Sequence, residues 1–406
     1  MWSFFIHVSF LIFFAISGLI WNIAYFSARD TYKRFPKPKK LQRVSLLFPV
    51  YREKYDSIWT TVKSVITQDY SKKFLEVIFI TEPDDVQTQI CVKKMCETLK
   101  NHGIVSRIVV SDGKKKIKAH ALNFGLKVAT GEVIGILDAD DALPPDYISQ
   151  AVSAICHGYE CIGTRVYRLR KNLSSQLLHL ELKLWYDLHL PVFWKITGFH
   201  PHSGEGLFVS RGLLEKIGGF PEVLSEDIFT SFYAFAKGFK TCMLDAIILE
   251  LAPKNLTSLM MQRTRWMRGT AQLMYYVLTS DLKFTQKIKI EFAFWLPFIT
   301  SVGQILVCLT ILDMLLVLIR IKSSFSLAIL ISCNQYIITL LGIIMFIVYM
   351  PKTFIDFISL INTVREWKLN PIVILLFPFY LFITALIALY ALLTPFKSHW
   401  YKTERR

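Results

Sequence analysis

The sequence predicts a Rossmann-like α/β domain joined to an α-helical transmembrane domain. Two observations lead to this expectation. Short apolar strands alternate with helical segments between about residues 44 and 137, and both ends of the chain are strongly apolar. In 406 residues, 53% are hydrophobic and the mean hydropathy is +0.40, which is high for a soluble protein. Alternating strands and helices predict a mostly parallel sheet with helices on both faces.

The N-terminal apolar run, Phe4 to Phe26, contains no charged side chain. As a helix it is long enough to cross a hydrocarbon core of roughly 30 Å. No small-residue cleavage site follows it, and the next residues are basic: Arg29, Lys33, Arg34, Lys37, Lys39, Lys40 and Arg43. We therefore expect residues 1–28 to be an N-terminal transmembrane helix with the following domain in the cytosol. A cleaved signal peptide is the alternative.

The soluble pattern covers residues 44–254. We expect strands at 44–50, 75–81, 107–110 and 132–137, and helices at 56–67, 87–101 and 119–129. Ligands of such sheets bind beyond the carboxyl ends of the strands. Polar residues directly after each strand are therefore the first candidates for chemistry.

Apolar segments return after this domain. Residues 173–196 form an amphipathic pattern that predicts either an interfacial helix or a helix packed on the sheet, and we expect further interfacial helices at 255–289. A C-terminal transmembrane region is predicted at 290–394, with spans at 292–319, 325–349 and 371–393 and an interfacial helix at 352–368. The basic tail, 395–406, gives conflicting signals: four crossings place it outside, and its charge places it in the cytosol.

Charge and cysteine usage restrict the class of protein. The formal net charge is +16 and the pI is near 9.4. Beside membrane segments, this charge favours a membrane surface and anionic substrates, and we expect no nucleic-acid partner. The seven cysteines show no paired CxxC spacing, which predicts free thiols and no zinc site.

The first chemical candidate is Asp138-Ala139-Asp140, directly after the strand at 132–137. Carboxylates at this spacing can face one point. Together with phosphate oxygens they are the ligands that hard divalent cations such as Mg²⁺ or Mn²⁺ prefer. Asp138 and Asp140 are therefore candidate metal ligands, and a solvated turn before Pro144 is the alternative.

The stretch from Lys118 to Asp141, KAHALNFGLKVATGEVIGILDADD, resembles the K-A-x-A-L-N and D-A-D-D blocks of family 2 glycosyltransferases. The resemblance implies the GT-A fold, a cytosolic nucleotide-sugar site and a divalent cation. It also covers residues 48–53 and 81–85, where Arg52 and Glu82 depart from the usual pattern. The substrate-binding candidates implied on the donor side are Pro49, Tyr51, Glu53, Glu82, Asp84, Lys118 and Asp138.

The segment Ser225-Glu226-Asp227 resembles the family's acceptor-side S-E-D motif. This implies that Asp227 is the general base and that Glu226 belongs to the catalytic pair. A positioned carboxylate can take the proton of a sugar hydroxyl as the new C–O bond forms. An acidic helix start capped by Ser225 is compatible with this role.

Residues 262–266, QRTRW, match the Q(Q/R)xRW block of membrane-bound cellulose, hyaluronan, chitin and poly-N-acetylglucosamine synthases. The substrate-binding candidates here are Gln262, Arg263, Arg265 and Trp266. On a helix, Gln262, Arg265 and Trp266 share one face. Arg265 suits a diphosphate and Trp266 suits a sugar ring, although a basic-aromatic cluster also anchors proteins at membranes. The ending at 400–405 resembles a W-x-K-T-x-R tail of some bacterial members.

Together these motifs predict an inverting membrane glycosyltransferase that moves a sugar from a UDP-sugar to a growing polysaccharide in a β linkage. A non-processive glycolipid synthase similar to ceramide glucosyltransferase, with a membrane-lipid acceptor, is the alternative. A transport or scaffold protein with a degenerate transferase domain is a third reading, which the intact acidic motifs disfavour. We expect an integral protein of the cell membrane that contacts membrane lipids.

Overall fold

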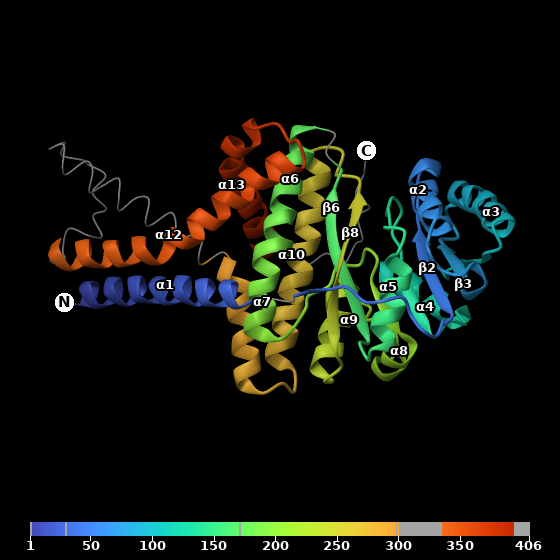
Figure 1. Cartoon of the computed structure of the whole chain (residues 1–406), viewed down its shortest axis with the longest axis horizontal. Coiled ribbons are helices and arrows are strands. Elements are labelled where there is room, and N and C mark those ends of the chain that lie inside the picture. The colour runs from blue at the N-terminus through green and yellow to red at the C-terminus, as the bar shows by residue number, and fades with distance from the viewer. Residues whose placement is uncertain (1, 29–30, 170–171, 298, 300–334, 394–406) are drawn as a thin grey trace. The chain divides into compact units, whose positions relative to one another are not determined.

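The computed structural model describes residues 2–28, 31–169, 172–297, 299 and 335–393 (Figure 1). The chain forms two compact units. The first consists of Met1–Arg29, Leu184–Gly198 and Lys283–Lys368, and the second of Asp30–Lys183, Phe199–Leu282 and Leu369–Arg406. The tail predicted at 395–406 and most of the span predicted at 292–319 lie outside the described residues.

The second unit is built on an eight-stranded sheet in the order β1-β8-β6-β7-β5-β2-β3-β4. The predicted strands appear as β2 (Val44–Val50), β3 (Leu75–Thr81), β4 (Val105–Val110) and β5 (Val133–Ile136). Four more strands complete the sheet: β1 (Tyr32–Lys33), β6 (Cys161–Arg168), β7 (Phe208–Ser210) and β8 (Thr241–Glu250). All neighbours pair in parallel except β7, which runs antiparallel to β5 and β6.

Helices alternate with the strands as the sequence predicts. They are α2 (Tyr55–Ile66), η1 (Lys72–Phe74), α3 (Val86–Asn101), α4 (Lys118–Val128), α5 (Tyr147–Cys156), α8 (Arg211–Ile217) and α9 (Glu226–Ala236). A fully buried cluster that includes Leu47, Leu122, Ile134 and Leu213 packs α4 and α8 against the sheet. Each such side chain contributes about 1.5–3 kcal/mol through burial, which fixes the start of α4 against the strand ends.

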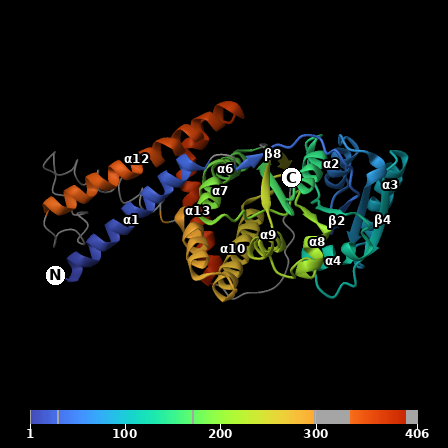
Figure 2. The ribbon, with the colours of Figure 1, turned by 60° about the horizontal axis from the view of Figure 1, so that its bottom comes forward.

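Three further helices belong wholly or mainly to the second unit: α6 (Leu173–Leu184), α10 (Leu256–Thr279) and α13 (Ile372–Leu393). Helices α10 and α13 lie side by side (Figures 1 and 2). The helical range predicted at 173–196 is divided into α6, the π-helical η2 (Trp185–His189) and α7 (Leu190–Thr197).

In the first unit, α1 (Trp2–Ser27) runs alongside α12 (Gln335–Glu366), as Figure 2 shows. Gly18 permits this contact, because a Cβ there would lie 2.8 Å from Val348 Cγ1. Asn22 Nδ2 donates a hydrogen bond of 2.7 Å to the Val348 carbonyl, and Tyr349 Oη donates one of 3.0 Å to the Phe14 carbonyl. A small residue and interhelical hydrogen bonds are the usual means by which apolar helices associate.

Helix α12 differs from the expected layout. The sequence predicts a span ending at 349 and a separate interfacial helix from 352, but the helix continues through Pro351 to Glu366. Among the described residues, two helices are long and apolar enough to cross a membrane: Phe346–Glu366 and Ile372–Ala391.

Candidate active site

Sheet topology brings four charged residues to one edge. Strands β5, β6 and β8 point the same way, and β7 runs against them, so its start lies at their carboxyl ends. Asp138 follows β5, Glu205 precedes β7, Arg168 ends β6 and Glu250 ends β8. One carboxylate oxygen each from Asp138, Glu205 and Glu250 lie within 4.8 Å of one another, a set that can hold a metal ion.

Arg168 places a fixed positive charge beside these carboxylates. It is the register partner of Glu250 at the ends of the parallel strands β6 and β8. The two side chains form an ion pair and are 2% and 0% exposed. Arg168 Nη2 also lies 3.9 Å from Glu205 Oε1. Because buried carboxylates repel one another, this guanidinium makes their convergence possible.

The turn that carries Asp138 is fixed by the next two aspartates. Asp140 has a left-handed backbone, with φ at 79°, and its Oδ2 accepts a hydrogen bond of 2.7 Å from Leu251 N. Asp141 Oδ2 accepts one of 2.8 Å from Asp138 N. Burial, together with the charge of Asp138, raises the pKa of Asp141 well above its usual value. One oxygen of the expected metal ligand Asp140 is therefore engaged with the backbone.

Lys118 connects the metal-side carboxylate to the predicted catalytic pair. Its Nζ lies 2.6 Å from Asp138 Oδ1 and 3.6 Å from Glu226 Oε1. Burial opposes its charged form, but the carboxylates of Asp138, Glu226 and Glu205 outweigh this effect and raise the pKa of Lys118. A Cβ at Gly204 would lie 2.9 Å from Lys118 Nζ and 3.4 Å from an oxygen of Asp227. The glycine thus leaves room for the lysine and the aspartate beside it.

Glu226 and Asp227 form the first turn of α9. Asp227 Oδ1 accepts a hydrogen bond of 2.8 Å from Ile228 N. Burial and the charge of Glu226 raise the pKa of Asp227 to about 7, against the opposing charge of Lys118. Burial also raises the pKa of Glu226, while Lys118 and Arg265 oppose the rise. A carboxylate with a pKa near neutrality is suited to accept a proton.

Helix α10 brings the Q-R-T-R-W block to this cluster. Gly269, one turn beyond Arg265, packs directly on the residue before Glu226: a Cβ there would lie 1.9 Å from Ser225 Oγ. Gln262 is 2% exposed and Trp266 is partly buried. The charge of Arg265 acts on Glu226, so this candidate lies near the acidic pair.

Arg263 is engaged elsewhere. Its guanidinium binds both carboxylate oxygens of Glu181, with Nη1–Oε1 at 2.7 Å, and lies 5.1 Å from the ring of Trp266. Tyr380 Oη donates a hydrogen bond of 2.6 Å to Glu181 Oε2. These contacts join α6, α10 and α13, so in this structure the side chain ties helices together.

The donor-side candidates form a second polar group after β2 and β3. Asp84 Oδ2 accepts hydrogen bonds from Lys116 Nζ at 2.6 Å and from Tyr51 Oη at 3.3 Å. The bond to Lys116 is the main cause that lowers the pKa of Asp84. Glu53 and Asp84 line a groove of about 640 Å³.

The other two donor-side candidates lie in or next to the sheet. Glu82 is buried and its Oε2 accepts a hydrogen bond from Ser111 Oγ. Pro49 pairs with Ile80 of β3, beyond the point where β5 stops pairing with β2 at Leu47. Proline has no backbone N–H to donate. Because β5 no longer pairs with β2 at this position, no hydrogen bond between β2 and β5 is lost.

Sequence reasoning missed three residues of the cluster. Glu205 lies between two glycines, Gly204 and Gly206, shortly before β7, and it was not assigned as a ligand. Glu250 and Arg168 end strands that were not predicted. Their opposite charges at the ends of two β-rich runs, 161–168 and 241–250, are the only sequence signal that points to them.

Several known proteins are similar to this chain over its α/β domain. The family model described as "Glycosyltransferase like family 2" matches residues 42–269, more than half of the chain. A probable glycosyltransferase of Bacillus subtilis, YdaM, is 26% identical over 255 residues, which cover 61% of this chain and 60% of that protein. The poly-beta-1,6-N-acetyl-D-glucosamine synthase of Staphylococcus aureus is 25% identical over 295 residues, 69% of this chain and 68% of the synthase.

A solved structure shares the fold. The mannosyltransferase PcManGT of Pyrobaculum calidifontis, in complex with GDP-Man and Mn²⁺, superposes with a TM-score of 0.59 at 21% identity, covering 89% of this chain and 99% of that one. The predicted GT-A fold, a Rossmann-like α/β domain, is thereby confirmed.

Proposed function

The chain belongs to family 2 of the glycosyltransferases, and we propose that it is an inverting membrane enzyme that moves a sugar from a UDP-sugar to a growing polysaccharide. The observation that supports this most directly is the ion-paired cluster of Asp138, Lys118 and Glu226, with Asp227 beside it. It gathers groups from three separate stretches of sequence that suit the two ends of a displacement: an anionic leaving group and a nucleophilic hydroxyl.

A divalent cation fits the donor end of this cluster. The three carboxylates of Asp138, Glu205 and Glu250 offer only hard oxygen ligands within 4.8 Å of one another, as Mg²⁺ or Mn²⁺ requires. Bound there with phosphate oxygens, the cation would neutralise charge on the departing diphosphate. The sequence predicted Asp138 and Asp140 as the metal ligands. In this cluster, Glu205 and Glu250 accompany Asp138 instead.

Asp227 acts at the acceptor end. Its carboxylate takes the proton of the acceptor hydroxyl while the oxygen bonds to the anomeric carbon. The bond from that carbon to the phosphate oxygen breaks, and its electron pair leaves with UDP. Lys118 and Arg265 lie near the acidic pair and stabilise the negative charge of the leaving group. One displacement inverts the anomeric carbon, so an α-linked donor gives a β linkage.

A polysaccharide acceptor is supported by the Q-R-T-R-W block on α10 and by the similarity to poly-beta-1,6-N-acetyl-D-glucosamine synthase. Helices α12 and α13 would hold the enzyme in the cell membrane with the catalytic domain in the cytosol. A glycolipid acceptor uses the same chemistry and is distinguished by the product.

The experiment is donor-screened release of UDP from the purified full chain in lipid nanodiscs, followed by sizing of the product. UDP-glucose, UDP-N-acetylglucosamine and GDP-mannose are offered with Mn²⁺ or Mg²⁺. A polymer or oligomer ladder supports the proposal, and a single glycolipid product replaces it with the alternative. No turnover with any UDP-sugar contradicts the donor assignment.

A further inference from the structure

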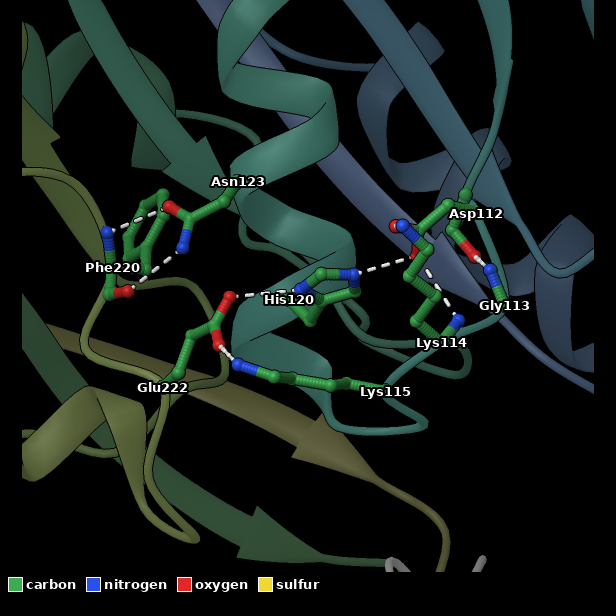
Figure 3. A network of polar contacts seen from close by, with 9 residues as sticks. Asp112, Gly113, Lys114, Lys115, His120, Asn123, Phe220 and Glu222 are labelled. Atoms are coloured by element: carbon green, nitrogen blue, oxygen red, sulfur yellow. Dashed lines mark hydrogen bonds and ion pairs between the residues drawn. The ribbon is translucent and has the colours of Figure 1, made fainter.

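His120 joins two loops of the candidate site. It lies in the first turn of α4, two residues after Lys118. Its Nε2 is 2.8 Å from Asp112 Oδ1, and its Nδ1 is 2.8 Å from Glu222 Oε1 (Figure 3). Asp112 belongs to the loop between β4 and α4, and Glu222 to the segment that leads from α8 into Asp227. One imidazole ring therefore bridges the donor-side loop and the segment before the predicted base.

A second bond joins the same two loops, and two further contacts lie within the first of them. Lys115 Nζ pairs with Glu222 Oε2, and Lys114 N donates a hydrogen bond of 3.0 Å to Asp112 Oδ1 (Figure 3). Lys114 Nζ is a further 3.9 Å from Asp112 Oδ2. Among the described residues, Asp112 and Glu222 contact the His120 ring, and Lys114 and Lys115 pair with those carboxylates. The ring of Phe124 packs against His120 at 5.2 Å between ring centroids.

One turn along α4, a second contact fixes the segment before Glu222. Asn123 Nδ2 donates a hydrogen bond of 2.9 Å to the Phe220 carbonyl, and Phe220 N donates one of 2.8 Å to Asn123 Oδ1. The side-chain amide of Asn123 and the backbone groups of Phe220 do not titrate. Their two hydrogen bonds keep the segment near α4 when the contacts of His120 change. His120 is therefore not the sole contact that holds this segment.

We propose that His120 is a positioning residue whose imidazolium clamps the loop at Asp112 to the segment at Glu222, and that its deprotonation releases this clamp. A neutral imidazole has one N–H donor and one lone pair, whereas the imidazolium donates from both nitrogens. Two carboxylates, one at each nitrogen, can therefore both be satisfied only by the charged ring.

The direction of the pH effect follows. Burial lowers the pKa of His120, but the hydrogen bonds to Glu222 and Asp112 outweigh this and raise it above 6.5. The clamp is complete below that value and is lost as the pH rises through the raised pKa. Lys118 lies two residues before His120, and Asp227 five residues after Glu222, so release loosens both ends of the site.

The clamp is tested by hydrogen–deuterium exchange of the full chain at about pH 6.5 and pH 9, compared as protection factors. In the wild type, the peptides covering residues 111–117 and 219–225 should lose about tenfold protection at the higher pH, as expected for one charge-assisted hydrogen bond. His120→Gln should show that loss already at pH 6.5. His120→Arg, which stays charged and can donate to both carboxylates, should keep protection at both values.

His102→Gln is the matched control, because within the described part of the chain the His102 ring makes one polar contact, from Nδ1 to the Thr98 carbonyl of the preceding helix at 2.9 Å. It should leave both peptides unchanged. If His120→Arg disturbs the fold, Glu222→Gln gives an independent reading: with one carboxylate neutral, the midpoint of the wild-type transition should move to lower pH. Equal protection at both pH values in the wild type, or wild-type behaviour of His120→Gln, would overturn the clamp.

For its effect on transfer, the inference rests on the proposed function. UDP release should show an alkaline fall in kcat/KM in the wild type that is absent in His120→Arg. If no UDP-sugar is turned over, the proposed function fails while the exchange result still decides the clamp. If turnover occurs and the alkaline fall is the same in His120→Arg, the clamp does not govern transfer.

Discussion

Lys118 Nζ lies 2.6 Å from Asp138 Oδ1, so a lysine at the start of α4 already neutralises the first carboxylate after β5. Only 12% of the Lys118 side chain and 21% of the Asp138 side chain are exposed. At this burial the pair interacts more strongly than a surface ion pair. A cation that binds Asp138 must therefore compete with the lysine, and the charge of the site depends on where Lys118 points.

Replacing Lys118 with methionine should separate cation binding from transfer. Lys118→Met removes the competing charge, so Mn²⁺ should bind the donor-free enzyme about tenfold more tightly or better. Transfer should fall because the charge that stabilises the leaving diphosphate is lost. Calorimetry with Mn²⁺ and UDP release measure the two effects, and weaker Mn²⁺ binding in the variant contradicts the competition. Lys100→Met, on the exposed end of α3, is the control.

Asp227→Asn should lower transfer by about 10²–10⁴-fold, the usual loss when a general base is removed. Binding of UDP with Mn²⁺ should persist, since the cation is expected on other carboxylates. Asp281→Asn, at an exposed position beyond α10, should leave turnover unchanged. Turnover by Asp227→Asn within a factor of about two of the wild type removes this residue as the base.

The same substitution should raise stability at alkaline pH. The folded-state pKa of Asp227, about 7, exceeds the ordinary value of 3.8 for an aspartate, so the folded protein holds a proton that the unfolded chain releases. Stability from this group therefore falls as the pH rises between these values. Above pH 7, Asp227→Asn should melt at a higher temperature than the wild type. An equal or lower melting temperature there argues against the buried charge.

The acid limb of the pH profile should report Asp227. The base acts only when deprotonated, so kcat/KM should rise tenfold per pH unit below about 7 and level off above it. This limb and the alkaline fall assigned to His120 have opposite signs. His120→Arg should therefore remove the alkaline limb and keep the acid one. A flat profile through neutrality contradicts the assignment to Asp227.

Glu205 and Asp140 should respond differently to substitution. Glu205→Gln removes one charge from the carboxylate cluster, and Mn²⁺-dependent UDP binding should weaken about tenfold or more. Asp140→Asn keeps an oxygen that can accept from Leu251 N and should bind Mn²⁺ nearly as the wild type does. Asp140→Ala loses that acceptor and should lower the free energy of unfolding by about 1–3 kcal/mol. If Asp140→Asn loses Mn²⁺ binding, then Asp140 is a metal ligand as the sequence predicted.

Gly269→Ala should displace α10 from the segment before the acidic pair. The added Cβ would lie 1.9 Å from Ser225 Oγ and 2.8 Å from Ser225 Cβ, so one of the two must move. Transfer and melting temperature should both fall, and Ser225→Gly in the same chain should restore part of each. Gly212→Ala meets nothing within 4 Å and serves as the control. Full activity of Gly269→Ala would show that α10 tolerates the shift.

The parallel half of the sheet was predictable because its signals are local. The strands at 44–50 and 75–81 were predicted with the bounds observed, since continuous apolar runs between helical segments are typical of buried parallel strands. The candidate residues after those strands could be expected to lie close together, because the carboxyl ends of parallel strands meet at one edge of the sheet. The sequence predicted a span up to 349 and an interfacial helix from 352, whereas the structure has one continuous helix across Pro351, because a proline in a helix bends or weakens it without always ending it.

The sequence by itself determined the α/β class, the apolar ends, and the acidic and basic motifs from which the site is built. Only the tertiary structure decided which charges meet. Strands β6 and β8 pair across about 80 residues of chain, and the antiparallel β7 brings Glu205 to the same edge. Local sequence patterns do not determine such pairings. Strand pairing depends on which strand edges remain free once the rest of the sheet has formed. For this reason the pairing of Glu250 with Arg168, and of His120 with its two partners, was decided by the folded chain.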